Sequence, residues 1–490
     1  MNSTEIPNWL KQRAFLTPNR IAIKTEYEEI SFLTLHKNVL KKTNQLTYAG
    51  LKKDDVVAIL MKNSIQMVEV IHALKNIGAI TVLLNIKLTS NELEFQLQDS
   101  GAKMVITDNA LLDKVDHVNH EIIRVKELSE LPEKDCIIQE YFCLDKADTV
   151  MYTSGTTGNP KGVIHTYGNH WWSAIGSSLN LGLYQNDCWL LSVPMFHISG
   201  LSILNKSVIY GIPVVLQEGF DPKKANDAIM NHGVTIMSLV SVMLKRMVDE
   251  LGSRSYPDSF RGMLLGGGPA PKPLLEECMD RNIPVFQTYG MTETASQVVT
   301  LAPEYSISKL GSAGKPLFPV EIKIEKDGLI ANPNEVGEIV VKGPNVTKGY
   351  LNRVDATTTS IIDGWLYSGD MGYLDEEGFL FVMDRRSDLI ISGGENIYPA
   401  EIEAALLAHP SILEAGVTGL EHEEWGQVPA AFVKLDDGSG LTEDDIMAFC
   451  YERLARYKVP KSIHFVDSLP RNASNKLMRR KLVDLIKDGR

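Results

Sequence analysis

The sequence predicts an α/β protein, with a large multi-layer N-terminal domain of parallel-type sheets and a small α+β domain at the C-terminal end. The chain has 490 residues, which is more than one hydrophobic core supports, so two or more domains are expected. Strand-like and helix-like segments alternate through the first half, a pattern typical of parallel sheets covered by helices. The C-terminal part has strands and helices of its own, and about 100 residues suffice for an independent domain.

Local signals place the individual elements. Residues 56–60 read VVAIL, an apolar run of strand length, and Asn63 can cap an amphipathic helix that ends at Gly78. Further helices are expected where Thr89 with Glu92, Asp221 with Pro222, Pro399 and Thr442 provide start signals, the last running to Tyr457. Further strands are expected at 80–84, 105–107, 189–193, 234–237, 263–265, 285–286, 381–384, 389–391, 415–417, 430–435 and 463–466.

The composition is that of an ordinary globular protein, with 44% hydrophobic and 23% charged residues. A formal net charge of -13 argues against a nucleic acid or an anionic membrane as partner. The five cysteines form no Cys-x-x-Cys pair, so neither a zinc site nor a disulfide framework is indicated. No apolar leader and no run of about eighteen apolar residues occurs, so we expect neither a signal peptide nor a membrane span. A cytoplasmic protein is predicted, and a homo-oligomer stays open.

The segment 151–162, MYTSGTTGNPKG, has the chemistry of a polyphosphate loop. Its glycines allow close backbone approach to an anion, successive N–H groups can form an anion-binding nest, and hydroxyls and Lys161 add donors and charge. A Walker A loop is disfavoured, because Pro160 stands where its second glycine should be and Gly162 follows the lysine. A flexible Ser/Thr/Gly linker is the alternative that composition alone leaves.

This loop resembles the phosphate loop of the acyl-adenylate-forming enzymes, which comprise acyl-CoA synthetases, firefly-type luciferases and peptide-synthetase adenylation domains. The resemblance implies ATP, Mg²⁺ and, for a synthetase, coenzyme A as ligands. It also implies an ATP- and acyl-binding domain over residues 1–384, a hinge at 385–387 and a mobile domain over 388–490. The ATP-binding residues that it implies in this loop are Thr153, Ser154, Gly155, Thr156, Thr157, Gly158 and Lys161.

Two later segments match the same family in the same order. A glycine run follows the strand at 263–265, and by itself it is explained equally well by a structural turn. The stretch 287–294, QTYGMTET, combines an aromatic ring, a glycine, a hydroxyl and a carboxylate, which suit a base, a phosphate and Mg²⁺, although a solvated loop is the alternative. The resemblance implies ATP contacts by Gly266, Gly267, Gly268, Pro269, Gln287, Tyr289 (adenine), Gly290 and Thr292 (α-phosphate), with Glu293 holding the metal.

The nucleotide's ribose is assigned by resemblance as well. Asp370 follows a glycine in an expected turn, where an aspartate usually serves only as a local cap. In the family an aspartate at this position contacts the ribose hydroxyls, and an arginine matching Arg385 does so too. The hinge residue of the family is usually Asp or Lys, whereas this chain has Ser387.

The C-terminal domain matches at two further loops. Gly393, Gly394 and Glu395 lie in a glycine-rich loop that lines the thiol channel in the family. Lys476 matches the lysine that serves adenylation, although Asn475 replaces the usual preceding glycine and a lone surface lysine is normally only solvated. The catalytic residues implied by the resemblance are Lys161, Thr292, Glu293 and Lys476.

The acyl group is the least constrained part of the prediction. His197, Ser199 and Lys206 follow a strand end in the region where the family builds its acyl site, although His197 can be only an aromatic gate and Lys206 only a solvated helix residue. Several phrases, among them FHISGLS and LPRNASNKL, match the branch that activates an aromatic acid with a second carboxylate. The alternatives are another aryl- or medium-chain acyl-CoA ligase, a P-loop ATPase, and a non-catalytic nucleotide-binding protein.

Overall fold

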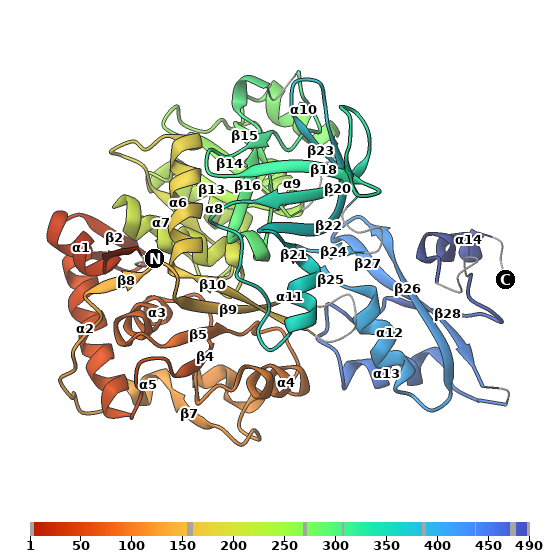
Figure 1. Ribbon diagram of the computed structural model, residues 1–490, viewed down its shortest axis with the longest axis horizontal. Helices are drawn as coiled ribbons and strands as arrows, with labels where there is room; N and C mark the ends of the chain where they lie inside the picture. Colours follow the sequence, from red (N-terminus) through yellow and green to blue (C-terminus); the bar gives the residue numbers. More distant parts are fainter. Residues whose placement is uncertain are drawn as a thin grey trace. The chain divides into compact units, whose positions relative to one another are not determined.

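The computed structural model describes residues 4–153, 160–267, 272–305, 308–384, 389–436, 438–470 and 477–487. It is a mixed α/β structure (Figure 1) that divides into two compact units. The first unit comprises Met1–Ile86, Leu97–Met151 and Gly162–Met383, and the second comprises Lys87–Gln96, Tyr152–Lys161 and Asp384–Arg490. Along the described residues, no helix is long and apolar enough to cross a membrane.

One sheet carries the strand that leads into the phosphate loop. Its strand order over the described residues is β10-β9-β5-β4-β6-β7, and the pairs β4/β5, β4/β6, β5/β9 and β6/β7 are parallel, as expected from the alternation of strands and helices. The strands are β4 (Val56–Leu60), β5 (Ile80–Leu83), β6 (Met104–Thr107), β7 (Glu121–Arg124), β9 (Ala147–Thr153) and β10 (Lys161–Thr166). The helices along this part of the chain are α2 (Phe32–Tyr48), α3 (Ile65–Ile77), α4 (Ser90–Ser100) and α5 (Val125–Leu128).

A second sheet, in the first unit, has the order β17-β16-β15-β14-β13-β11-β12-β2-β3 over the described residues. Strands β2, β12, β11, β13, β14 and β15 run parallel, and β3, β16 and β17 are antiparallel additions at the two ends. The strands are β2 (Ile21–Lys24), β3 (Glu29–Ser31), β11 (Trp189–Leu191), β12 (Val214–Leu216), β13 (Ile236–Leu239), β14 (Gly262–Leu265), β15 (Val285–Met291), β16 (Ser296–Thr300) and β17 (Lys315–Pro316).

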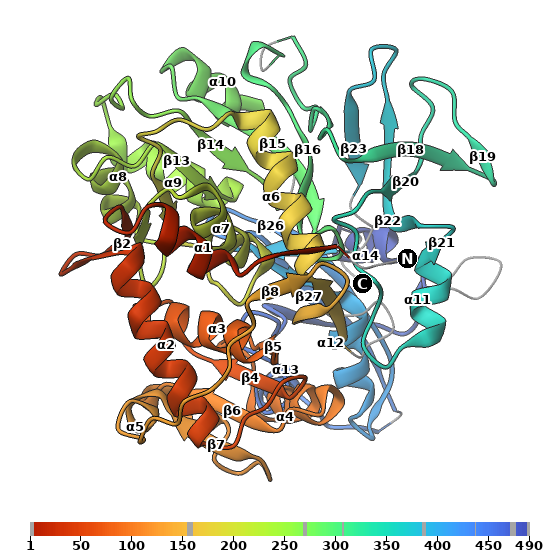
Figure 2. The same cartoon turned by 60° about the vertical axis from the view of Figure 1, so that its left-hand side comes forward.

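Helices cover both faces of this second sheet. Figures 1 and 2 show α6 (Tyr167–Leu181) along β16, and α8 (Pro222–Asn231) and α9 (Ser241–Leu251) beside β13 and β14. One continuous core joins side chains of both sheets, α1 (Trp9–Leu16) and α7 (Ile198–Tyr210), while a second core lies under α8, α9 and α10 (Lys272–Asp280). The central strands β11, β12, β13 and β14 are therefore buried on both faces, which explains why they are short and apolar.

The remaining sheets are largely antiparallel. The third sheet of the first unit contains β18 (Glu321–Lys326), β19 (Leu329–Ile330), β20 (Gly337–Lys342), β21 (Ile361–Ile362), β22 (Trp365–Leu374) and β23 (Leu380–Asp384), near α11 (Val354–Ser360). The second unit has β24 (Ile390–Ser392), β25 (Glu395–Ile397), β26 (Ile412–His422), β27 (Gly426–Leu435) and β28 (Ser462–Phe465), with α12 (Pro399–Leu407), α13 (Glu443–Tyr451) and α14 (Leu482–Lys487).

Local start signals were predicted well, with one exception. Asp221 caps α8, and Thr89 and Glu92 form the expected reciprocal hydrogen bonds at the start of α4. The cap of α3 is Ser64 rather than Asn63. Asn63 instead donates to the Val193 carbonyl and accepts from the Met195 N–H, both at 2.9 Å. It therefore ties the first sheet to the segment that follows β11.

Four predictions of element boundaries or loops were wrong. β15 continues through Met291, because β16 follows the turn and pairs with it antiparallel. Asp370 lies inside β22 and not in a turn. The glycine-rich segment before α12 forms a hairpin, in which Gly393 and Gly394 have φ of 57° and 87° and β25 pairs with β24. Helix α13 ends at Tyr451, not at Tyr457.

A buried ion pair joins α3 to β9. Lys75 Nζ bonds Asp148 Oδ2, and both side chains are almost fully buried. The ammonium also lies 5.4 Å from the Trp9 ring centroid and 5.5 Å from that of Tyr167. Burial lowers the pKa of Lys75 and raises that of Asp148, and each partner opposes the shift of the other. The two charges are thus tolerated only together.

We expect Asp148→Leu to destabilise the first unit by about 3–5 kcal/mol, because it leaves the ammonium of Lys75 buried without a counter-charge. The double variant Lys75→Met/Asp148→Leu should regain most of that loss, since it removes both charges. Urea unfolding followed by tryptophan fluorescence measures the difference. A double variant as unstable as Asp148→Leu would show that the pair is not the source of the effect.

Candidate active site

The predicted site segments follow the parallel strands of the second sheet. Strands β11, β13, β14 and β15 are parallel neighbours, so the residues after them emerge at one edge of the sheet. His197 lies shortly after β11, Val240 directly after β13, Gly266 directly after β14, and Thr292 directly after β15. Open parallel sheets bind ligands at this carboxyl edge. The structure thus gathers there the residues expected to contact acyl group, adenine and phosphate.

The glycines after β14 lie against the neighbouring strands. A Cβ on Gly266 would lie 3.0 Å from Thr288 Oγ1, and one on Gly267 would lie 2.9 Å from Val240 Cγ1. Gly267 also has φ of 82°, a conformation that a larger residue adopts only with strain. Thr288 Oγ1 in turn donates to the Leu265 carbonyl at 3.2 Å. Gly266 and Gly267 therefore form a tight bend whose backbone lies close to β15, just after the pairing of Leu265 with Gln287.

Two residues that were predicted separately form a hydrogen bond. Tyr289 Oη, on β15, donates to Asp370 Oδ2, on β22, at 2.8 Å, and both side chains are buried. Ser368 Oγ accepts from the Asp370 N–H at 3.1 Å. Tyr289, which was expected at the adenine, therefore orients the carboxylate of Asp370, which was expected at the ribose. The two residues are 81 positions apart in sequence.

The turn after β15 presents the predicted phosphate and metal residues. Glu293 Oε1 accepts a hydrogen bond from Tyr350 Oη at 2.9 Å, and its backbone carbonyl accepts from the Thr347 N–H at 2.7 Å. In the described ranges, no three His, Cys, Asp or Glu side chains come together as a metal site. Mg²⁺ in nucleotide enzymes usually keeps waters and needs only one or two carboxylates beside the phosphates. A single oriented carboxylate at Glu293 fits that requirement.

The predicted acyl residues lie on α7 or at its start. His197 is the N-cap residue of α7, and its ring lies 4.7 Å from the Phe196 ring, centroid to centroid. Ser199 and Lys206 are seven positions apart, so they share one face of the helix. Ser202, on the same face, bonds Ser296 Oγ at 3.4 Å and thereby points this face toward β16.

Lys206 is not the solvated residue that the alternative assumed. Its side chain is 2% exposed, and Nζ lies 5.2 Å from the Trp189 ring centroid, with no acidic side chain among the described residues paired to it. Burial lowers the pKa of Lys206 to about 7. The neighbouring Asn205 was missed by sequence reasoning, and neither polar atom of its buried amide has a hydrogen-bond partner in the described structure. Only the fold reveals these two polar groups as buried.

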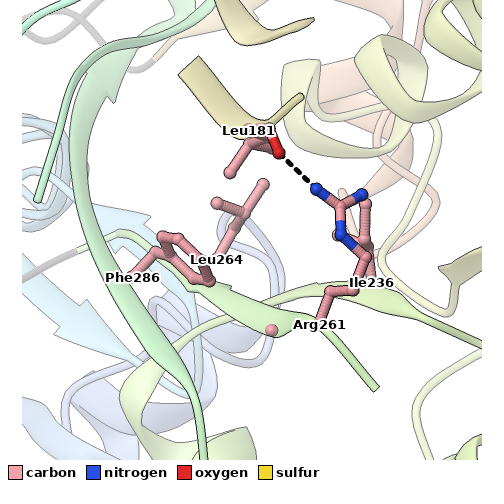
Figure 3. A pocket seen from close by; sticks show the side chains of 6 residues that line it. Leu181, Ile236, Arg261, Leu264 and Phe286 are labelled. Atoms are coloured by element: carbon pink, nitrogen blue, oxygen red, sulfur yellow. Dashed lines mark hydrogen bonds between the residues drawn. The ribbon is translucent and has the colours of Figure 1, made fainter. Parts of the chain in front are cut away.

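The small cavity in Figure 3 is a different feature. It measures about 10 Å³ and is lined by apolar parts of Leu181, Ile236, Leu264 and Phe286, with Arg261 at one side donating to the Leu181 carbonyl. Its volume is near that of a single water molecule. Ile236 begins β13, so the cavity lies toward the amino ends of the strands. It therefore cannot hold an acyl group.

The second unit carries the remaining described candidates. Thr153 ends β9 and Lys161 begins β10. Gly393 and Gly394 form the hairpin turn, where the Gly393 N–H donates to the Trp425 carbonyl at 2.9 Å. Glu395 is buried and accepts from Lys87 Nζ at 2.7 Å, within the same unit. The candidates outside the described residues are Ser154, Gly155, Thr156, Thr157, Gly158, Gly268, Pro269, Arg385, Ser387 and Lys476.

A family model for AMP-binding enzymes matches residues 10–351, and a model for the C-terminal domain of AMP-binding enzymes matches residues 401–476. The chain belongs to the AMP-binding enzymes. This membership, with the α/β architecture and the two domain matches, confirms the predicted fold class.

The chain is also similar to particular AMP-binding enzymes over almost its whole length. It is 62% identical over 483 residues to a 2-succinylbenzoate–CoA ligase of a Geobacillus species, covering 99% of this chain and 98% of the relative. It is 52% identical to o-succinylbenzoate CoA synthetase of Bacillus subtilis, a double mutant bound to a product analogue, with a TM-score of 0.95 over 98% of this chain and 99% of that chain. The narrower resemblance in the sequence phrases is to this same ligase, and these relatives confirm it.

Other complexes of the Bacillus subtilis enzyme contain earlier reactants. One holds the acyl-adenylate intermediate and another holds ATP with a magnesium ion. Each is 51% identical to this chain with a TM-score of 0.78, covering 98% of this chain and 98% and 100% of those chains. These complexes thus include ATP and Mg²⁺, the ligands implied by the resemblance of the phosphate loop.

We expect Tyr289→Phe to raise KM for ATP by about 10- to 100-fold with kcat nearly unchanged, because a hydrogen bond to a carboxylate is worth about 1.5–3 kcal/mol. The variant removes the hydroxyl that donates to the Asp370 carboxylate at 2.8 Å. Steady-state kinetics at varied ATP measure the change. Tyr367→Phe is the matched control, since this tyrosine on β22 bonds Glu325 at 3.1 Å instead. Equal effects of the two variants would contradict a role for the Tyr289 contact.

Proposed function

We propose that this AMP-binding enzyme is a 2-succinylbenzoate:CoA ligase of menaquinone biosynthesis. It converts 2-succinylbenzoate, ATP and coenzyme A into 2-succinylbenzoyl-CoA, AMP and diphosphate through an acyl-adenylate. The observation that carries this proposal is the 62% identity to such a ligase across both domains. A cytoplasmic location goes with the proposal. Another aryl- or medium-chain ligase is not favoured, because the relatives that are more than half identical to this chain carry one substrate name.

In this proposal the carboxyl edge of the second sheet binds the nucleotide. The backbone at Gly266 and Gly267 and the ring of Tyr289 accept the adenine, and Asp370 accepts hydrogen bonds from the ribose hydroxyls. Thr292 donates to the α-phosphate, and Glu293 holds the Mg²⁺ that neutralises phosphate charge. Attack of the acid on the α-phosphate builds negative charge on its oxygens, which fixed cations stabilise where water is excluded. Lys161 and Lys476 are the cations proposed for that step.

The second step needs a different face of the small domain. Thiol attack on the acyl-adenylate displaces AMP and needs no extra cation at the phosphate. We assign the hairpin of Gly393, Gly394 and Glu395 to the path of the thiol. A site cannot hold Lys476 and a thiol channel in one place, so rotation about residues 385–387 is the economical answer.

The proposal predicts products and a split between the two steps. With 2-succinylbenzoate, ATP and coenzyme A, the enzyme should release AMP and diphosphate, whereas a P-loop ATPase would release ADP and phosphate. Lys476→Ala should slow adenylation by about 10²- to 10³-fold, the usual cost of removing one charge-stabilising donor. Conversion of pre-made acyl-adenylate and coenzyme A should be nearly unchanged.

The matched control is Lys481→Ala, which removes an exposed lysine of the same C-terminal segment. Chromatography of nucleotides and thioesters measures both steps. Release of ADP, or of AMP with other acids but none with 2-succinylbenzoate, would reject the proposed function. An equal loss in the two steps would reject the assignment of Lys476 alone.

The acid's second carboxylate needs a partner in the pocket. Burying this charge without one would cost several kcal/mol. Lys206 offers a buried ammonium with no described acidic partner, and Asn205 offers a buried amide with no described hydrogen-bond partner. An ammonium whose pKa falls to about 7 through burial alone is stabilised when an anion binds beside it. We therefore propose that Lys206, with Asn205, binds the ring carboxylate, near His197 and Ser199.

We expect Lys206→Met to lower kcat/KM for 2-succinylbenzoate by about 10- to 100-fold, the 1.5–3 kcal/mol of a charge-assisted hydrogen bond. It should leave 4-phenyl-4-oxobutanoate, which lacks the ring carboxylate, nearly unchanged. Because kcat/KM reports the free enzyme, the value for the diacid should fall above pH 7, where Lys206 loses its proton, and that for the monoacid should not.

Lys224→Met, at an exposed lysine of α8, is the control for the loss of a positive charge. Equal effects of Lys206→Met on the two acids, or none on either, would direct the search to His197 and Ser199 instead.

A further inference from the structure

The turn after β15 is held at four successive backbone carbonyls. Asn345 Nδ2 donates to the Thr294 carbonyl at 2.9 Å, and Ser173 Oγ donates to the Ala295 carbonyl at 2.7 Å. The Thr347 N–H donates to the Glu293 carbonyl, as described above. The fourth donor is His165 on β10, whose Nε2 lies 2.6 Å from the Thr292 carbonyl oxygen. These donors come from three different segments, all in the first unit.

The turn needs such support because its backbone is strained. Ala295 and Ser296 have φ of 51° and 114°, values that are unfavourable for residues with a Cβ. A strained turn persists only when its surroundings hold it. The side chains that it presents, at Thr292 and Glu293, must be placed to within fractions of an ångström for phosphoryl chemistry.

The contact fixes the tautomer of His165. A carbonyl only accepts hydrogen bonds, so Nε2 must bear the hydrogen. The ring is fully buried and neutral, with a pKa lowered to about 4 by burial, so Nδ1 is an acceptor. Thr149 Oγ1, at 3.4 Å from Nδ1, supplies the hydrogen that Nδ1 accepts. With its only hydrogen given to Nδ1, Thr149 Oγ1 acts as an acceptor in its other contact.

The next donor in the chain is His170. Its Nε2 lies 2.9 Å from Thr149 Oγ1 and 3.5 Å from Asp148 Oδ2. A carboxylate beside Nε2 favours the tautomer with hydrogen on that nitrogen. Asp148 is held as a charge by the buried ammonium of Lys75. Each group thus sets the direction of the next hydrogen bond.

We propose that His165 is a positioning residue for adenylation: it holds the Thr292 carbonyl, and the buried relay through Thr149, His170 and Asp148 fixes its tautomer. The inference rests on the proposed function, because it assigns Thr292 and Glu293 to phosphate and magnesium. His165 itself touches no substrate. It affects the reaction by fixing the position of the turn that carries Thr292 and Glu293. Residues that orient metal-binding carboxylates act in the same indirect way.

The first test compares two substitutions at His165. His165→Leu removes the donor, and adenylation with MgATP should fall by about 10- to 100-fold, the usual range for residues that orient a metal ligand. His165→Gln keeps an N–H near the position of Nε2 and should retain most of the rate. Conversion of pre-made acyl-adenylate and coenzyme A should be nearly unchanged in both variants.

The second test removes the relay without touching His165. Thr149→Val should slow adenylation by about 2- to 10-fold, the value of one neutral hydrogen bond. Thr81→Val is the matched control, because Thr81 pairs with Thr149 in the β5/β9 register and its buried hydroxyl has no described partner. Both variants make the same change in the same sheet, so their difference isolates the contact to His165.

A third readout does not depend on turnover. Calorimetric titration with ATP should show a weaker gain from Mg²⁺ in His165→Leu than in the wild type, while binding of ATP in EDTA is unchanged. Any of three results would overturn the proposal. They are loss of both half-reactions together, equal adenylation rates for His165→Leu and His165→Gln, and equal effects of Thr149→Val and Thr81→Val. Failure of the wild type to form AMP from any acid would instead reject the proposed function, and the magnesium titration would still decide the role of His165.

Discussion

Parallel pairing of β11, β13, β14 and β15 is the constraint on which the rest of the site depends. Because these strands run in one direction, every segment that leaves them emerges at the same edge. Residues as far apart in sequence as His197 and Thr292 therefore lie at one edge of the folded sheet. Strands β11, β13 and β14 are three or four residues long and almost entirely buried, which fixes the points from which the following loops leave the sheet.

Polar groups inside the first unit act as a set rather than one by one. Lys75 and Asp148 tolerate burial only as a pair, and their charges decide how His170 and Thr149 are hydrogen-bonded. A hydrophobic replacement of comparable size would serve stability as well, as is often found for buried ion pairs. In the proposal for His165, the pair also gives the relay a direction that ends at the carbonyl of Thr292.

Sequence reasoning succeeded where the information is local. Strand runs and the caps at Asp221 and Thr89 depend on neighbours within a few positions. Asp370 was placed in a turn because the pairing of β22 with β20, which keeps residues 365–374 in one strand, is invisible in the local sequence. His165 was not recognised at all, since its partner lies 127 positions away. Lys206 was found, but its burial follows from helix packing that no spacing rule reveals.

Gly290 shows that a residue inside a family motif can be required by the backbone rather than by the ligand. A Cβ at this position would lie 2.2 Å from the Ser296 carbonyl oxygen, so the close approach of β16 at the bulge already requires glycine. Any protein that keeps this hairpin would keep the glycine, whether or not it binds a nucleotide. In the segment Tyr-Gly-Met-Thr-Glu, the side chains around the glycine are therefore the evidence for nucleotide binding. The glycine itself indicates only the backbone geometry.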